Sequence, residues 1–235
     1  MSVPQVHRLT RVTSTLDVMH EYAGRGAPGG TVVVADEQVE GRGTRGRTWH
    51  SPPGGLWYSI LYRDASESGL EFLSLRIGLV VAAAIENVIP SQRLGLKWPN
   101  DLMLGERKLG GVLCEARWQG ATLGWVAVGI GINVTNPVPP GLEASAVSLR
   151  SVDPGAAAER LIEPVTAALR QLPLQVDALS GSELADFQGR DWLQGRTLLE
   201  PVSGIARGIQ PDGSLLIERA DGTTTQVRAG RLMLD

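Results

Sequence analysis

The chain has 235 residues, 43% of them apolar and 20% charged, and its formal net charge is -3. This composition is ordinary for a globular protein, and the length suits one sizeable domain with a small second domain. The charge argues against a general nucleic-acid binder, and the sequence has no apolar run as long as a membrane span. A single cysteine, Cys114, excludes an intramolecular disulfide, and the start resembles no signal peptide, which favours a cytoplasmic protein.

The first half of the chain predicts helices and strands in alternation. Ser14 and Asp17 form an S-x-x-D capping pattern, so we expect a helix to begin near residue 14. A second, alanine-rich helix is predicted over 72–89, where Pro90 closes it. Short runs of apolar and aromatic residues predict strands at 31–35, 56–62, 94–98, 108–116 and 122–134.

The composition changes in the second half. Residues 135–149 are rich in proline and predict a loop. Helical sequence resumes near Ala156, and Pro164 is expected to kink or split that helix. From about Gly195, five short strand-like segments are separated by Gly, Asp and Pro, which is typical of a small barrel-like β module. We therefore expect two domains, 1–192 and 193–235.

A loop rich in glycine and arginine, GRGTRGR at 41–47, follows the first predicted strand and precedes Trp49. Glycines let backbone N–H groups approach an anion, and arginines supply forked donors that match phosphate or carboxylate oxygens. The spacing fits neither a P-loop nor a dinucleotide-binding fingerprint. The loop therefore predicts a site for an anionic or nucleotide ligand, in preference to nucleic acid, a membrane surface or a solvated turn.

Lysine is rare in this chain. Of the 22 basic residues, 20 are arginine, and the two lysines, Lys97 and Lys108, both lie in the segment KWPNDLMLGERKLGG. An ammonium is a compact point charge on a flexible stem, which a planar guanidinium does not reproduce. The pattern predicts that this segment needs such a charge.

Five segments occur in a fixed order: STLD near the start, GRGTRGRTWHSPPGGLWYSI, KWPNDLML, RKLGGVLCE and GIGINV. Together they resemble biotin protein ligases, and the resemblance runs from about Val6 to the end of the chain. It implies an α+β fold, in which a mixed β-sheet backed by helices precedes a small β-barrel that resembles an SH3 domain. It also implies two chemical steps. ATP with Mg²⁺ converts biotin to biotinoyl-5'-AMP, and a lysine of a biotin carboxyl carrier domain then takes the biotinoyl group.

The resemblance also assigns roles to residues. Lys108 would bridge the carboxylate of biotin and the α-phosphate, Arg45 and Arg47 would neutralise phosphate charge, and Asp101 would lie near the metal and the incoming lysine. Most members of the family carry arginine at the position of Thr44, so either Arg45 substitutes for it or the adenylate is retained more weakly. The residues expected to bind biotin or its adenylate are Ser14, Thr15, Leu16, Gln38, Gly41, Arg42, Gly43, Thr44, Trp49, Lys108, Gly111, Leu113 and Asn133. No protein ligand set is predicted for Mg²⁺ beyond Asp101.

Other functions fit parts of the sequence. A lipoate ligase would share the fold and the acyl-adenylate chemistry, although the R-G-R-x-W and K-W-P-N-D patterns favour biotin. Some members of the family are also DNA-binding repressors with an added N-terminal domain. Here the ligase pattern starts within about 14 residues of Met1, whereas a folded domain needs on the order of 50, so we expect no sequence-specific DNA binding. A third alternative is a ligand-free interaction module built on the C-terminal strands, but it leaves most of the chain unexplained. The pattern leaves open a monomer or a homodimer.

Overall fold

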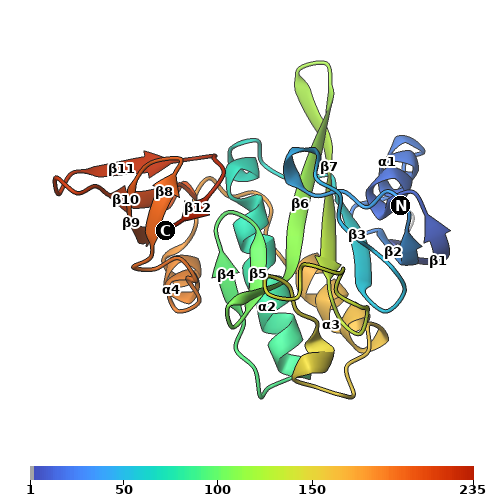
Figure 1. The fold of residues 1–235 in the computed structure, drawn as a ribbon. Coiled ribbons are helices and arrows are strands. Elements are labelled where there is room, and N and C mark those ends of the chain that lie inside the picture. Colours follow the sequence, from blue (N-terminus) through green and yellow to red (C-terminus); the bar gives the residue numbers. More distant parts are fainter. Residues whose placement is uncertain (1–2) are drawn as a thin grey trace.

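The computed structural model describes residues 3–235 and contains two β-sheets (Figure 1). The strands of the larger sheet are β1 (Val6–Val12), β2 (Val32–Gln38), β3 (Leu56–Tyr62), β4 (Gly95–Lys97), β5 (Asp101–Leu104), β6 (Arg107–Gln119) and β7 (Thr122–Ile132). Their order in the sheet is β1-β2-β3-β7-β6-β5-β4. β1 pairs in parallel with β2, and the other neighbours run antiparallel. The expected mixed sheet is therefore confirmed.

The sequence pattern finds most of these strands. The run predicted at 56–62 coincides with β3, and the other four predicted runs overlap β2, β4, β6 and β7. The pattern misses β1 because this edge strand carries exposed and half-buried residues throughout. It also misses β5, a strand of four residues that begins at Asp101, directly after the turn that follows β4.

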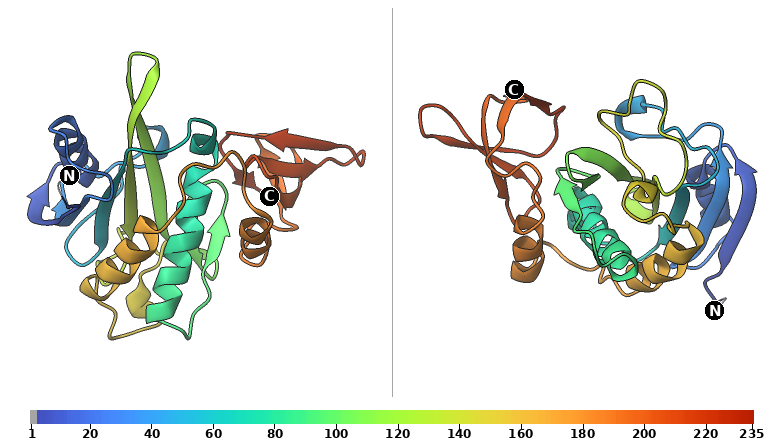
Figure 2. Two further views of the ribbon diagram at one scale, coloured as in Figure 1. Left: turned by 180° about the vertical axis from the view of Figure 1, so that it is seen from behind. Right: turned by 60° about the horizontal axis from the view of Figure 1, so that its bottom comes forward.

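Helices cover both faces of the larger sheet (Figure 2). Val33 packs with Leu16 and Met19 of α1 (Thr15–Gly24), whereas Val32 and Val34 belong to a second cluster with residues of α2 (Leu73–Val88) and α3 (Glu159–Arg170). Because neighbouring residues of a strand point to opposite faces, α1 covers one face, and α2 and α3 cover the other. The helices are α1 (Thr15–Gly24), α2 (Leu73–Val88), α3 (Glu159–Arg170) and α4 (Gly181–Gln188), with short 3-10 turns η1 (Thr44–Gly46), η2 (Ser68–Glu71) and η3 (Leu149–Ser151).

The helix ends show where local sequence decided the structure. The side chain of Ser14 accepts a hydrogen bond from the backbone of Leu16 and caps α1, as the capping pattern predicts. Of the kink or split expected at Pro164, the split is absent, because α3 continues through that residue. A proline removes one intrahelical hydrogen bond, and the buried apolar face of α3, which includes Leu161 and Val165, outweighs that loss.

A second sheet follows the helices. Its strands are β8 (Thr197–Glu200), β9 (Gly204–Ile209), β10 (Leu215–Glu218), β11 (Thr224–Val227) and β12 (Met233–Leu234). They pair antiparallel in the order β11-β10-β9-β8-β12. The five strand-like segments predicted near the C-terminus are confirmed, and the limits 1–192 and 193–235 stay a prediction.

The second sheet packs against the N-terminal end of α2 in the larger unit. The indole of Trp98 donates a hydrogen bond to the carbonyl oxygen of Gly213 at 2.8 Å. Gly213 has a positive φ of 78°, and a Cβ there would lie 2.6 Å from Cβ of Phe72, so only glycine fits this contact. Among the described helices, none has the length and hydropathy of a membrane span.

Candidate active site

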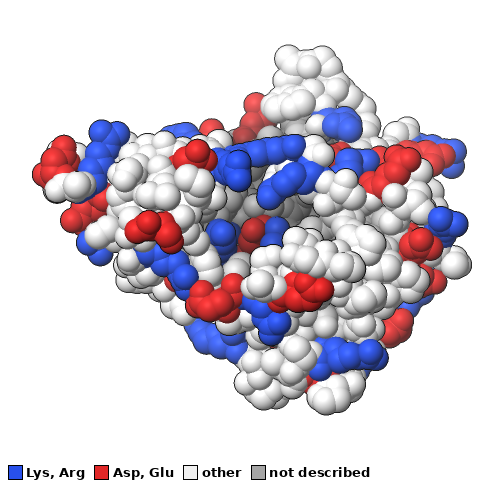
Figure 3. Space-filling view, viewed as in Figure 1, with Lys and Arg blue, Asp and Glu red and all other residues white. Residues whose placement is uncertain are grey.

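A cavity of about 590 Å³ lies between the glycine-arginine loop, the strands β6 and β7, and the junction with the second sheet. Figure 3 shows a hollow in the molecular surface with lysine and arginine side chains at its rim and inside it. A volume of this size suits a small-molecule ligand. The predicted site residues that line the cavity are Ser14, Thr15, Leu16, Gln38, Arg42, Gly43, Thr44, Arg47, Trp49, Asp101, Lys108, Gly111, Leu113 and Asn133.

Two predicted site residues, Gly41 and Arg45, do not line the cavity. Gly41 is buried behind the loop, where a Cβ would lie 2.3 Å from the carbonyl oxygen of Trp49 and 2.5 Å from Oγ of Ser51. Arg45 is exposed and has a φ of 60°, a backbone conformation that is uncommon for a residue with a side chain. Gly41 therefore shapes the base of the loop, and Arg45 lies on its outer side.

A polar cluster forms one wall of the cavity at the N-terminus of α1. Oε1 of Gln38 accepts hydrogen bonds from the backbone N–H of Thr15 at 2.8 Å and from its hydroxyl at 3.1 Å. The hydroxyl of Ser59 donates to Oγ1 of Thr15 at 2.7 Å, and Nε2 of Gln38 donates to Oγ of Ser51 at 2.9 Å. Because these contacts fix the hydroxyls and the amide, the wall offers oriented donors and acceptors to a neutral polar group.

Glycines of β7 let two apolar side chains lie flat on the sheet. A Cβ at Gly129 would lie 2.9 Å from Cδ1 of Leu16, and a Cβ at Gly131 would lie 2.5 Å from Nε1 of Trp49. Both contacts are closer than side chains tolerate, so the G-I-G-I-N segment needs glycine at these positions. Gly129 and Gly131 line the cavity, although neither was among the predicted site residues. The sequence feature that could have predicted this role is the pair of glycines inside a strand.

An ion pair lies at the opposite end of the cavity. Nζ of Lys108 is 2.6 Å from Oδ1 of Asp101 and 5.0 Å from the centre of the Trp49 ring. The pair forms where β5 and β6 lie side by side, in a register that places Asp101 opposite Gly111. Because Gly111 has no side chain, the space beside both charged groups stays open. The site thus holds a fixed ammonium next to a carboxylate, with room for an anionic group.

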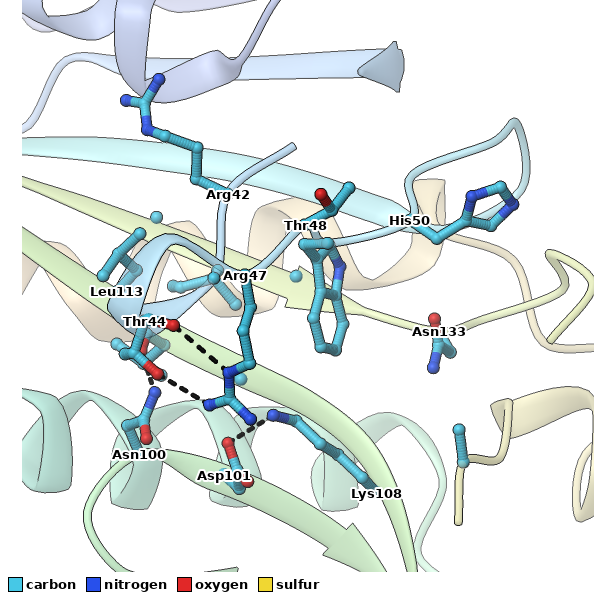
Figure 4. A pocket seen from close by; sticks show the side chains of 18 of the residues that line it. Arg42, Thr44, Arg47, Thr48, His50, Asn100, Asp101, Lys108, Leu113 and Asn133 are labelled. Atoms are coloured by element: carbon cyan, nitrogen blue, oxygen red, sulfur yellow. Dashed lines mark hydrogen bonds and ion pairs between the residues drawn. The ribbon is translucent and has the colours of Figure 1, made fainter. Parts of the chain in front are cut away.

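The loop arginines point in different directions (Figure 4). Arg47 extends toward Asp101 and Lys108, and its guanidinium donates to the carbonyl oxygen of Thr44 at 3.2 Å and to its hydroxyl at 2.9 Å. Arg42 extends away from that ion pair. Thr44 therefore holds Arg47 next to the ion pair, whereas Arg45, which was predicted to act beside it, does not line the cavity.

Arg42 belongs to a network of charged side chains that no sequence pattern predicted. Its guanidinium contacts Asp17 of α1 and donates from Nε to Oε1 of Glu115 at 3.2 Å. Trp125 donates to Nδ1 of His20 at 3.0 Å, so Nε2 of His20 carries a proton and donates to Glu115 at 2.8 Å. The hydrogen bond from His20 and the charge of Arg42 outweigh burial and lower the pKa of Glu115 to about 2. The network anchors the start of the loop to β6.

Asn133 is fixed at the far end of β7. It is buried, and its Oδ1 accepts a hydrogen bond from the side chain of Asn136 at 3.0 Å. The loop that follows contributes Pro139, Leu142 and Ala146 to the cavity wall. This loop lies within the proline-rich segment at 135–149, so the two predicted loops form two sides of one site.

Further cavity residues come from the strand that precedes Asp101 and from the junction between the two units. Lys97 and Trp192 line the cavity, as does Glu106, which pairs with Arg196 at 2.7 Å. Lys97 carried a signal in the sequence, because it is one of only two lysines, whereas nothing in the sequence placed Trp192 near it. Within residues 3–235, no three His, Cys, Asp or Glu side chains converge on a point that could hold a metal.

Comparison with known proteins agrees with this geometry. Residues 7–133 match the biotin/lipoate A/B protein ligase family, and the chain therefore belongs to that family. The bifunctional ligase/repressor BirA of Bacillus subtilis is 38% identical over 59% of this chain and 44% of its own length. The biotin--[acetyl-CoA-carboxylase] ligase of Mycobacterium tuberculosis is 29% identical over 93% of this chain and 84% of its own. The chain thus aligns with less than half of the first relative and with most of the second.

The fold agrees as well. The structure of a biotin protein ligase from Aquifex aeolicus in complex with biotin and ATP superposes with a TM-score of 0.79 at 26% identity. The superposition covers 99% of both chains, so it includes the mixed sheet and the second, antiparallel sheet. The family resemblance noted from the sequence and the expected fold class are both confirmed.

Proposed function

We propose that this protein activates biotin with ATP to biotinoyl-5'-AMP and transfers the biotinoyl group to a lysine of a biotin carboxyl carrier domain. One observation carries the proposal. A single cavity holds an oriented neutral polar cluster at one end, around Thr15 and Gln38, and the Lys108–Asp101 ion pair at the other. Biotin has the same division, with a neutral ureido ring at one end and a carboxylate at the other.

The polar wall suits the ureido ring. That ring has one carbonyl oxygen and two N–H groups, and the wall offers hydroxyls from Ser14 and Thr15 together with the amide of Gln38. Ser14 and Thr15 are buried, so they lose little further contact with water when a ligand binds. A site whose buried polar groups are fixed in advance rejects a ligand that leaves them unpaired. Lipoate has no ureido ring, so this wall favours biotin.

The charged end suits the first chemical step. Attack of a carboxylate oxygen on the α-phosphorus of ATP brings two anions together, so the transition state needs positive charge that is already in place. Lys108 is held by Asp101, and Arg47 is held by Thr44 with its guanidinium directed at the same place. Lys108 would contact the carboxylate and the α-phosphate together, and Arg47 would neutralise a phosphate oxygen. Trp49 and Asn133 would bound the nucleotide side.

Magnesium fits this site as an ion that arrives with the nucleotide. Mg²⁺ usually binds through one or two carboxylates together with substrate phosphates and keeps several waters. Asp101 is the carboxylate beside the proposed α-phosphate position, and within residues 3–235 no larger group of metal ligands converges. When bound, the ion would neutralise charge on the phosphates. The contribution of the protein would be Asp101.

In the second step a lysine amine of the acceptor attacks the activated carbonyl, and the bond from that carbon to the phosphate oxygen breaks so that AMP leaves. An amine attacks only in its neutral form, so a nearby base is needed. Asp101 lies in the cavity wall and would accept that proton once the nucleotide phosphates draw Lys108 away from it. We propose a biotin-dependent carboxylase as the source of the acceptor domain and the cytoplasm as the compartment. Neither a monomer nor a homodimer is favoured by this geometry.

The test is mass spectrometry of a carboxylase carrier domain after incubation with the protein, biotin, ATP and Mg²⁺. We expect a gain of one biotinoyl group on a single lysine. The same reaction with lipoate in place of biotin is the matched control, and a variant with Lys108→Ala should give no product with either acid. An unmodified carrier domain, or modification by lipoate in preference to biotin, would refute the proposal.

A further inference from the structure

Lys97 is the last residue of β4, and its side chain lines the cavity. Its Nζ lies 5.0 Å from the centre of the Trp192 ring, and the guanidinium of Arg196 lies 3.7 Å from the same centre. The indole of Trp192 donates to the carbonyl oxygen of Gly105 at 3.0 Å, which fixes the ring. Two cations therefore meet at one aromatic ring, at the junction between the two sheets.

The charges near Lys97 do not balance. Burial is the main cause that lowers the pKa of Lys97, and Asp101 opposes it. Repulsion from Lys108, Arg196 and Arg47 lowers this pKa further. Asp101 is already bonded to Lys108, and Glu106 to Arg196. The cavity end thus holds four cations and two carboxylates that already have partners.

Apart from the Trp192 ring, the ammonium of Lys97 has no partner among residues 3–235. Throughout residues 3–235, no carboxylate or carbonyl oxygen lies within hydrogen-bond distance of its Nζ, and the side chain is half-buried. A half-buried charge without a hydrogen bond weakens the fold, so an anionic ligand would relieve that cost on binding. An anion with a single charge would be satisfied at Lys108, and the excess of positive charge suits an anion with several.

We propose that Lys97, held against Trp192, binds the polyphosphate tail of the nucleotide and then the departing pyrophosphate. This inference rests on the proposed function and names the place where its leaving group forms. An oxygen of the biotin carboxylate forms a bond to the α-phosphorus, and the bond from that phosphorus to the oxygen bridging the α- and β-phosphates breaks. The bridging oxygen keeps the electron pair and leaves as part of pyrophosphate. Lys97 would stabilise the charge that grows there.

The position of Trp192 also connects this site to the segment that leads into the second sheet. Trp192 and Arg196 belong to the segment between α4 and β8, which leads into the second sheet. The segment that leads into the second sheet would therefore take part in nucleotide binding, because it supplies the ring on which Lys97 lies. Nothing comparable is expected for biotin, whose proposed site is built from α1, β2, β6 and β7.

The test compares Lys97→Met with wild type, because methionine has a similar length and no charge. We expect calorimetry with inorganic pyrophosphate, in the absence of biotin, to show at least about tenfold weaker binding in the variant. The KM for ATP should rise by a similar factor while the KM for biotin stays within about twofold. The thermal midpoint of the ligand-free variant should be equal to or above that of wild type, because an unpaired charge has been removed.

Arg93→Met is the matched control. Arg93 is exposed, lies four residues before Lys97 and does not line the cavity, so this variant should bind pyrophosphate like wild type. Unchanged pyrophosphate affinity in Lys97→Met would overturn the inference, and so would a wild-type protein that binds no pyrophosphate. Weaker pyrophosphate binding in Lys97→Met, with normal binding in Arg93→Met, supports it. These outcomes hold whether or not the carrier domain is biotinylated, so the binding data separate this inference from the proposed function.

Discussion

Replacing Lys108 by arginine would separate the charge of this side chain from its shape. The ammonium lies 2.6 Å from Asp101 and 5.0 Å from the centre of the Trp49 ring. A Cβ built on Gly111 would lie 3.5 Å from both Nζ and the carboxylate oxygen, so the charged atom lies directly beside the open space. A guanidinium extends further and is planar, so it would fill part of that space and direct its donors differently.

The expected loss follows from the role that the structure gives to Lys108. A preorganised donor that strengthens its contact in the transition state is worth roughly 2–4 kcal/mol. At about 1.4 kcal/mol for each factor of ten, this loss corresponds to about 30- to 1000-fold in kcat/KM for adenylate formation. The thermal midpoint should change by no more than about 2–4 °C, because arginine keeps the charge beside Asp101 in a partly exposed pair.

The assay is pyrophosphate release from ATP in the presence of biotin, measured without a carrier domain so that only the first step is observed. Lys108→Ala provides the reference for complete loss of the charge. A chain that uses arginine at 20 of its 22 basic positions would tolerate the exchange if charge alone mattered. Near-wild-type release of pyrophosphate by Lys108→Arg would refute the role given to Lys108, together with the argument from the rarity of lysine.

Three further substitutions test separate parts of the molecule. Gln38→Ala should raise the KM for biotin more than the KM for ATP in steady-state kinetics, because Gln38 belongs to the polar wall. Folding lowers the pKa of Glu115 to about 2 from 4.5, so its carboxylate stabilises the fold above pH 4.5, and this is lost as pH falls toward 2. Thermal melts of Glu115→Gln should therefore show a smaller loss of stability over that range. Burial raises the pKa of Asp191 to about 6, and its Oδ2 is buried without a partner among residues 3–235. Asp191→Asn should therefore raise the thermal midpoint at pH 7 but not at pH 3. An unchanged midpoint at pH 7 would contradict this.

Much of the fold was predictable because local patterns determined it. The strand at 56–62 is buried throughout and, apart from Ser59, aliphatic or aromatic, as expected of a strand covered on both faces, and it coincides with β3. The helix α4 was missed even though Ser180 and Glu183 form a capping box, because only one of its residues, Phe187, is buried. With so little apolar periodicity, the capping pattern was the only local signal for this helix.

The site was predictable where its residues share a motif, and less so where tertiary structure brings them together. The loop sequence could not distinguish Arg45 from Arg47, because their directions depend on the positive φ at Arg45 and on the hydrogen bonds of Thr44. The contact between His20 and Glu115 joins residues 95 positions apart, and only the placement of α1 against β7 and β6 creates it. No sequence spacing signals such a pair.

The hydrogen bond from Trp98 to Gly213 gives the KWPND segment a mechanical role. Trp98 is buried against the second sheet, while its neighbour Lys97 faces the cavity. A single peptide unit thus connects Trp98, which contacts the second sheet, to Lys97, a cation of the binding site. A hinge motion between the two units would therefore have to break the hydrogen bond between Trp98 and Gly213 or move Lys97 with it.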